Sequence, residues 1–195
     1  MTIIKNTRDF MASLSEGQMS DDEMISEFSK YVKNNCGELD AEFSQAILTS
    51  EPQARMSLVE DYAYKGAPAA QLSMGALKLA GKSIQQNIPE GIFWLKRAYL
   101  CKNPNAGLML FVVYSTAIGV SKDLVKAREY LTYSADLGLP KAQYYLAIML
   151  LEGQGGAMNE EQAIDLMSAS ASKGHTDARA FLQANGLHSR ISTDS

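Results

Sequence analysis

The sequence predicts an all-α protein, an α-solenoid of antiparallel helix pairs that repeat every 36 residues and follow an N-terminal helical extension. Three observations predict it. Four alanines recur at a 36-residue step with no gap, namely Ala70, Ala106, Ala142 and Ala178. A small residue followed three positions later by a larger one recurs at the same step, as in Gly91 and Trp94. Alanine, leucine and methionine are plentiful while proline is scarce, which favours helix.

The first 50 residues do not follow the repeat, and we expect them to form a helical extension or cap, residues 1–50. Asn6 or Thr7 is suited to cap a short helix that ends at Leu14. The stretch Ser20 to Glu23 is a capping box, which predicts a second helix. A third helix is expected from Glu38 to Leu48, with Leu39, Phe43 and Ile47 facing inward.

The predicted solenoid covers residues 51–186. It consists of a half unit (51–66), three full units (67–102, 103–138 and 139–174) and a final half unit (175–186), and a flexible tail (187–195) follows. Ser50 is expected to cap the first helix, with Pro52 in its first turn. Alanine or glycine at the helix crossings lets two axes approach to about 8–9 Å. Glycines after the first helices, Gly81, Gly119 and Gly153, are expected to supply left-handed C-caps.

Composition restricts the class of partner. The chain has 195 residues and a net charge of −4, and its first 66 residues hold 6 basic and 12 acidic side chains. An acidic first third disfavours nucleic acid and favours a basic protein partner. The start of the sequence has no sustained apolar run, and the longest one, Leu108–Tyr114, is too short to span a bilayer. Cys36 and Cys101 are interpreted as reduced thiols, so a cytoplasmic location is expected.

No catalytic, metal or cofactor site emerges from the sequence. The two histidines, His175 in a turn and His188 in the tail, have no metal-binding set around them and are interpreted as surface residues. The glycines from Gly153 to Gly156 follow a helix and lack the lysine of a phosphate loop, so a helix C-cap explains them. Glu160 and Glu161 suit the dipole of a helix N-terminus. We therefore expect a protein that is not an enzyme.

These repeats resemble the Sel-1-like repeat family, which is related to the tetratricopeptide repeat. The first-helix pattern of that family is matched in the second full unit by Ala106, Leu110, Tyr114, Gly119 and Val120. Its second-helix pattern is matched by a further six residues, Asp123, Lys126, Ala127, Tyr130, Ala135 and Gly138. The resemblance covers about residues 51–186 and implies an adaptor with a concave groove for a protein or peptide. Some members of the family carry disulfides within a repeat, and none is expected here.

In such solenoids the first helix of each unit lines the groove. Helical spacing from the anchor alanines then selects a mostly apolar set of candidate partner-binding residues, here called the groove set. Its members are Leu72, Ala76, Asn105, Leu108, Val112, Ser115, Lys141, Tyr144, Ile148 and Leu151.

The predicted function is a non-catalytic protein-interaction module, an adaptor or inhibitor. A narrower hypothesis is a bacterial immunity protein that neutralises a basic toxin or effector. The alternative is a structural or regulatory subunit that forms a homodimer through the same groove. Neither nucleic acid nor membrane is an expected partner, and no cofactor is expected.

Overall fold

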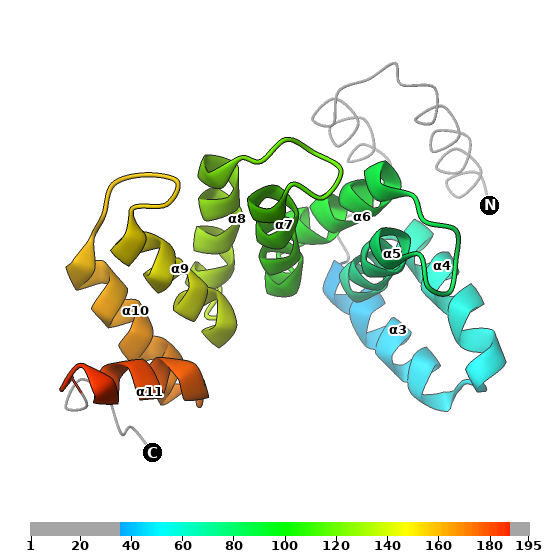
Figure 1. The fold of residues 1–195 in the computed structure, drawn as a ribbon. Coiled ribbons are helices and arrows are strands. Elements are labelled where there is room, and N and C mark those ends of the chain that lie inside the picture. The colour runs from blue at the N-terminus through cyan, green and yellow to red at the C-terminus, as the bar shows by residue number, and fades with distance from the viewer. Residues whose placement is uncertain (1–35, 188–195) are drawn as a thin grey trace. The chain divides into compact units, whose positions relative to one another are not determined.

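The architecture is all-α. The computed structural model describes residues 36–187, and these residues contain helices and no strand (Figure 1). The elements are α3 (Cys36–Thr49), a 3-10 helix η1 (Pro52–Ala54), α4 (Arg55–Lys65), α5 (Pro68–Ala80), α6 (Ile88–Leu100), α7 (Pro104–Thr116), α8 (Leu124–Asp136), α9 (Pro140–Glu152), α10 (Glu160–Ser172) and α11 (Thr176–Ala184). The predicted all-α solenoid fold is confirmed. The two helices expected before residue 36 lie outside the described residues.

The chain divides into two compact units, and each is described by itself. Unit 1 ends at Asn103 and its described part holds α3 to α6, while unit 2 starts at Pro104 and holds α7 to α11. Within each unit, consecutive helices pack against one another, as α5 does against α6 and α9 against α10. The division into half and full repeat units stays a prediction.

Helix starts follow the 36-residue step. The first helix of each full unit begins with a proline, Pro68, Pro104 or Pro140, at a position where the missing N–H costs no hydrogen bond. The second helices begin after a shared type of N-cap, an Asn or Asp whose side chain accepts a hydrogen bond from the backbone N–H three residues on. These caps are Asn87, Asp123 and Asn159, with bond lengths of 3.1, 3.0 and 3.0 Å.

Helix ends differ in part from the expectation. Gly81 and Gly153 are left-handed C-caps as predicted, both with φ of 66°. The equivalent residue after α7 is Ala117, with φ of 60°. Gly119 is left-handed too, with φ of 68°, but it lies two residues further along the chain. The reason is that α7 ends at Thr116, so the turn needs its left-handed residue at position 117. Lys102 is likewise left-handed, with φ of 61°, at the position that Gly66, Gly138 and Gly174 occupy in the other turns.

The prediction that Ser50 caps the next helix is wrong. The Ser50 hydroxyl donates backwards to the carbonyl of Ile47 at 3.0 Å, which satisfies the end of α3. Glu51 takes the N-cap position of η1 without a side-chain hydrogen bond, and Pro52 follows as its first residue. The helix α4 then starts three residues later than Pro52, at Arg55.

The core of unit 1 brings α3, α4, α5 and α6 together. Phe43 is the buried residue of α3, as predicted, and Leu39 and Ile47 pack partly buried beside it. The cluster also holds Val59, Ala63, Ala67, Ala70, Met74, Phe93 and Trp94. Where α5 meets α6, a Cβ built on Gly75 would lie only 3.0 Å from the carbonyl oxygen of Gly91. Two glycines therefore permit this close crossing.

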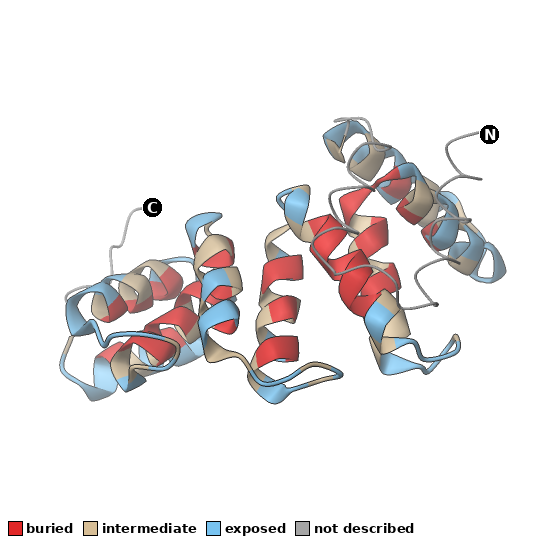
Figure 2. Ribbon diagram, turned by 90° about the horizontal axis from the view of Figure 1, so that it is seen from above, coloured by how far each residue is buried: buried red, intermediate tan, exposed pale blue. Residues whose placement is uncertain are grey.

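The core of unit 2 is formed by the inner faces of α8 to α11. The anchor residues Ala142 and Ala178 are fully buried in it, with Leu146, Met167 and Leu182 around them. Figure 2 shows the buried residues on the faces that the helices of each unit turn toward one another. Leu187, the last described residue, donates its N–H to the carbonyl of Leu182 at 2.8 Å and packs against this core.

A hydrogen bond from a side chain to the end of the preceding helix recurs with the repeat. Gln71, Gln143 and Arg179 occupy equivalent positions, and the side chain of each donates to the backbone carbonyl eight residues before it, at 3.3, 3.3 and 3.4 Å. These carbonyls belong to the last turn of the preceding helix, and each also accepts the backbone N–H of the turn glycine three residues on, Gly66, Gly138 or Gly174. The side chain therefore adds a second hydrogen bond at a helix end and joins two successive helices.

The expectation of two reduced cysteines is wrong. Cys36 and Cys101 form a disulfide, with their Cα atoms 6.1 Å apart. Cys36 is the first residue of α3 and Cys101 is the C-cap of α6, so the bond closes a separation of 65 residues. Sequence spacing did not reveal the pair because α3 lies outside the repeat and its docking depends on tertiary packing.

Candidate functional site

The groove set lies on three first helices, and none of its members is fully buried. Leu72 and Ala76, on α5 in unit 1, are half-buried. In unit 2, Asn105 and Lys141 are exposed, and Val112 keeps 41% of its surface accessible. The other members, all on α7 or α9, are half-buried, namely Leu108, Ser115, Tyr144, Ile148 and Leu151. Their role in binding a partner stays a prediction.

Four of these half-buried residues have a packing role as well. Leu108, Tyr144, Ile148 and Leu151 lie against the core of unit 2. Each therefore contributes to stability through one part of its side chain and presents another part to solvent. Val112 is different, because it is exposed and does not belong to this cluster. It is the member of the set that a substitution tests most directly.

Aromatic rings connect the first helices of unit 2. Phe111 of α7 stacks on Tyr145 of α9 with centroids 5.7 Å apart, and Tyr145 contacts Tyr144 edge to face at 5.4 Å. Tyr144 then stacks on His175, the N-cap of α11, at 4.7 Å and 19° between planes. We call these four residues the aromatic row. All four are half-buried, so the row is a partly accessible surface in which each ring contacts the next.

Sequence reasoning selected only Tyr144 from this row. His175 was interpreted as a surface residue, but it is half-buried and its Nδ1 accepts from the N–H of Ala178 at 3.4 Å. Phe111 and Tyr145 lie three to five positions after the anchor alanines, outside the spacing used to choose the groove set. Their aromatic character beside Tyr144 was the available signal.

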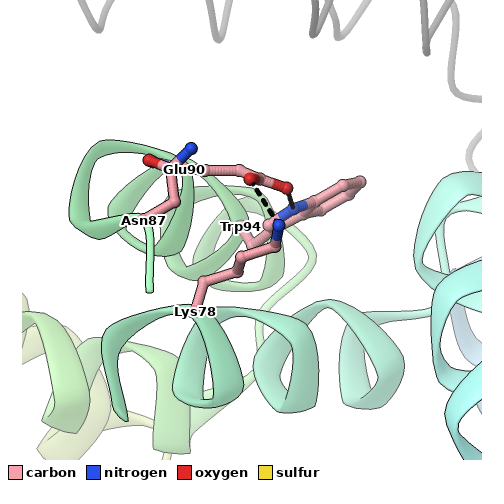
Figure 3. Close-up of polar contacts among 4 residues, drawn as sticks. All are labelled: Lys78, Asn87, Glu90 and Trp94. Atoms are coloured by element: carbon pink, nitrogen blue, oxygen red, sulfur yellow. Dashed lines mark hydrogen bonds and ion pairs between the residues drawn. The ribbon is translucent and has the colours of Figure 1, made fainter. Parts of the chain in front are cut away.

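Unit 1 contains a pocket of about 140 Å³ between α4, α5, α6 and the loop before α6. Its lining is Met56, Glu60, Tyr64, Met74, Lys78, Ile84, Glu90 and Trp94. Figure 3 shows the Glu90 carboxylate next to both Lys78 and Trp94. One Glu90 oxygen pairs with Lys78 Nζ at 2.7 Å, and the other accepts from the Trp94 indole N–H at 3.2 Å.

This arrangement suits packing better than catalysis. The Glu90 carboxylate is held by an ion pair and by an indole donor, and no serine, cysteine or histidine lies among the residues that line the pocket. The lining therefore offers no nucleophile with an adjacent base. Asn87 accepts from the backbone N–H of Glu90, so the same turn of α6 is held at three points.

Two other titratable groups are shifted by burial. Burial lowers the pKa of the Arg97 guanidinium in α6 to about 10, which leaves it charged at neutral pH. Burial raises the pKa of the Asp40 carboxyl in α3, and a hydrogen bond from the N–H of Ala69, at 2.8 Å, opposes that rise in part. Both groups lie in unit 1, and the Asp40 carboxyl joins α3 to α5 through the N–H of Ala69. They do not converge on a common cleft.

Between residues 36 and 187, no group of three or more His, Cys, Asp or Glu side chains is placed to hold a metal ion. None of the helices in this range is long and apolar enough to cross a bilayer.

Paired helices of equal length, small residues at the crossings and a recurring 36-residue step define an α-solenoid of tetratricopeptide-like helix pairs. The chain belongs to the Sel1 repeat family, and three copies of the repeat match at residues 68–103, 105–139 and 140–175. Sel1 repeats generally mediate protein binding.

Comparison with known proteins supports the same family. The chain is 30% identical, over 77% of its length, to an exopolysaccharide production negative regulator of Rhizobium meliloti, and it spans only 56% of that relative. It is similar to the structure of a Sel1 repeat protein from Oxalobacter formigenes, with 28% identity, a TM-score of 0.63 and coverage of 67% of this chain and 98% of that one.

A more distant structure shows the fold alone. It is a protective antigen of uropathogenic Escherichia coli strains that displays an SLR fold, with 20% identity and a TM-score of 0.64. The match covers 89% of this chain and 38% of that one.

Proposed function

We propose that the chain is a non-catalytic protein-binding module, an adaptor or inhibitor, and that unit 2 binds its partner over α7 and α9. The observation that carries the proposal is a partly exposed apolar surface, formed by Val112, the other apolar groove-set residues of unit 2 and the aromatic row. Rings that already contact one another lose little conformational freedom when a partner covers them. Such a surface suits an apolar peptide or helix.

A regulatory role is the form of this function that the comparisons favour. The relative from Rhizobium meliloti is described as a negative regulator, and binding to another protein is one way in which a regulator acts. A toxin-neutralising immunity protein is a narrower version of the same proposal. The exposed acidic residues of α3, α4 and the turn between them support a basic partner for it, and these are Glu38, Glu42, Glu51, Glu60 and Asp61.

Self-association through the same surface is the competing function. A homodimer that covers Val112 and the aromatic row removes the same apolar area from water as a foreign partner does. The two functions differ in whether the isolated protein is a stable dimer.

We also propose a cytoplasmic location, although the disulfide removes one of the arguments for it. It depended in part on two reduced cysteines, and Cys36 and Cys101 are paired. Disulfides persist mainly in oxidising compartments. Cell fractionation with an antibody against the full chain tests the location directly.

The test of the binding surface is affinity capture from the source cell with matched variants. Val112→Glu places a charge on the proposed surface, whereas Val125→Glu places the same charge on α8, at a residue that is 57% exposed. We expect one protein to be retained by the wild type and by Val125→Glu, and to be reduced at least tenfold by Val112→Glu. Retention by all three proteins contradicts the assignment to α7.

Light scattering of the isolated protein separates the two functions. A monomer at working concentration supports a foreign partner. A dimer that Val112→Glu dissociates and Val125→Glu leaves intact supports self-association. Helical circular dichroism of each variant confirms that the fold is retained.

A further inference from the structure

The first described helix of unit 1 is joined to the last one by a covalent bond. The disulfide links Cys36, at the start of α3, with Cys101, directly after α6. Both cysteines are half-buried. A thiolate from another molecule therefore has partial access to the bond, which a fully buried disulfide does not allow.

Within the part of the chain that the structure describes, α3 buries little of its own surface, with Leu39 and Ile47 only partly buried. Only Phe43 of its 14 residues is fully buried, whereas α6 buries eight of its 13. The Phe43 ring lies 5.6 Å from that of Tyr62, and Asp40 accepts from the N–H of Ala69. A helix of this length is marginal in water when it is not packed. Elements with few buried contacts are the ones that open first in a folded protein.

What α3 covers is apolar. It packs against α4 and α5, and the cluster beneath it includes Val59, Ala63 and Ala70. If α3 moves away, part of this cluster meets solvent. The bond at Cys36 restrains that movement because it holds the N-terminal end of α3 beside Cys101.

We propose that the Cys36–Cys101 disulfide is a redox-sensitive switch that controls whether α3 stays docked on unit 1. A dithiol reductant attacks one sulfur, forms a mixed disulfide with it and releases the other cysteine as a thiolate. The second thiol of the reductant then displaces the protein sulfur. Two electrons pass to the protein, which gains two thiols, and the reductant leaves as a disulfide. In the reduced state α3 opens and exposes the apolar faces of α4 and α5.

The test is amide hydrogen exchange of the full chain, followed by mass spectrometry, with and without dithiothreitol. We expect residues 36–49 to exchange at least tenfold faster in the reduced protein, while peptides from α9 and α10 in unit 2 exchange at an unchanged rate. Alkylation before and after reduction checks the bond itself, because Cys36 and Cys101 are expected to react with iodoacetamide only after reduction.

The double variant Cys36→Ser/Cys101→Ser is the matched control. It is expected to exchange fast in α3 under both conditions and to be insensitive to dithiothreitol. Equal protection of α3 in the oxidised and reduced wild type overturns the proposal and leaves a purely structural disulfide. Alkylation of both cysteines without reductant overturns it as well, since the bond then does not form. If the double variant fails to fold, fast exchange in α9 and α10 reveals it. The comparison of oxidised with reduced wild type then tests the proposal by itself.

Discussion

The Tyr144 ring lies almost parallel to the imidazole of His175, with centroids 4.7 Å apart and 19° between their planes. Tyr144 belongs to α9, and His175 is the N-cap of α11. One imidazole therefore both caps a helix and extends the aromatic row of unit 2. The sequence alone suggests no role for His175. In the structure it connects the proposed partner-binding surface, through Tyr144, with the last described helix, α11.

Replacement of His175 is expected to destabilise unit 2. His175→Ala removes an N-cap acceptor, worth about 1 kcal/mol, and a ring contact, worth about 0.5–1.5 kcal/mol. His175→Asn keeps a capping side chain and removes only the stack on Tyr144. It should therefore lower the free energy of unfolding by about half as much as His175→Ala does. Urea denaturation of the three proteins measures both values. Equal stability of wild type and His175→Ala would show that neither contact matters.

Glycine at two left-handed positions is expected to stabilise the protein. Lys102 and Ala117 have φ of 61° and 60°, a conformation that costs a residue with a Cβ about 1 kcal/mol. Lys102→Gly and Ala117→Gly should each raise the free energy of unfolding by about 0.5 kcal/mol, after the added flexibility of the unfolded chain is subtracted. As a control, Glu129→Gly within α8 should lower it by about 1 kcal/mol. Thermal or urea unfolding distinguishes the signs.

The stability contributed by Asp40 is expected to depend on pH. Its pKa is raised in the folded protein because burial disfavours the carboxylate, so the folded state binds more protons than the unfolded state between the two pKa values. The cost of burying the charge is fully present above the folded pKa and disappears as the pH falls below the unfolded value. Asp40→Asn does not titrate and keeps an oxygen that can accept from Ala69.

Urea denaturation of wild type and Asp40→Asn from about pH 7 down to about pH 3.5 measures this effect. The wild type is expected to gain stability relative to the variant as the pH falls through the range. A constant difference across the range would mean that Asp40 has the same pKa in both states.

An enlarged anchor residue is expected to disrupt the helix crossing. Ala142 is fully buried, so Ala142→Leu inserts three carbon atoms into packed space and should cost about 1–3 kcal/mol or more. Ala180→Leu adds the same atoms at an exposed position of α11 and should change stability by less than about 0.5 kcal/mol. Unfolding curves of the two variants provide the comparison. Similar losses would argue against a tight crossing at Ala142.

Features set by local spacing were predictable from the sequence. The four anchor alanines are all fully buried, and Gly81 and Gly153 take the left-handed conformation that a helix end requires. The sequence also contains local signals for the starts of the second helices. These are the N-caps Asn87, Asp123 and Asn159, which recur at the 36-residue step. The left-handed conformation of Ala117 was not predictable, because it depends on where α7 ends and alanine itself disfavours it.

By itself, the sequence determined the all-α class, the 36-residue repeat, the burial of Ala70, Ala106, Ala142 and Ala178, and the inward face of α3. These follow from helical periodicity, in which a residue type at a fixed step meets the same environment each time. Only the tertiary structure decided the Cys36–Cys101 bond, the contact of Asp40 with Ala69 and the stack of Tyr144 on His175. Each joins residues from different helices, and such pairs are selected by how the helices pack, for which the repeat spacing alone contains no signal.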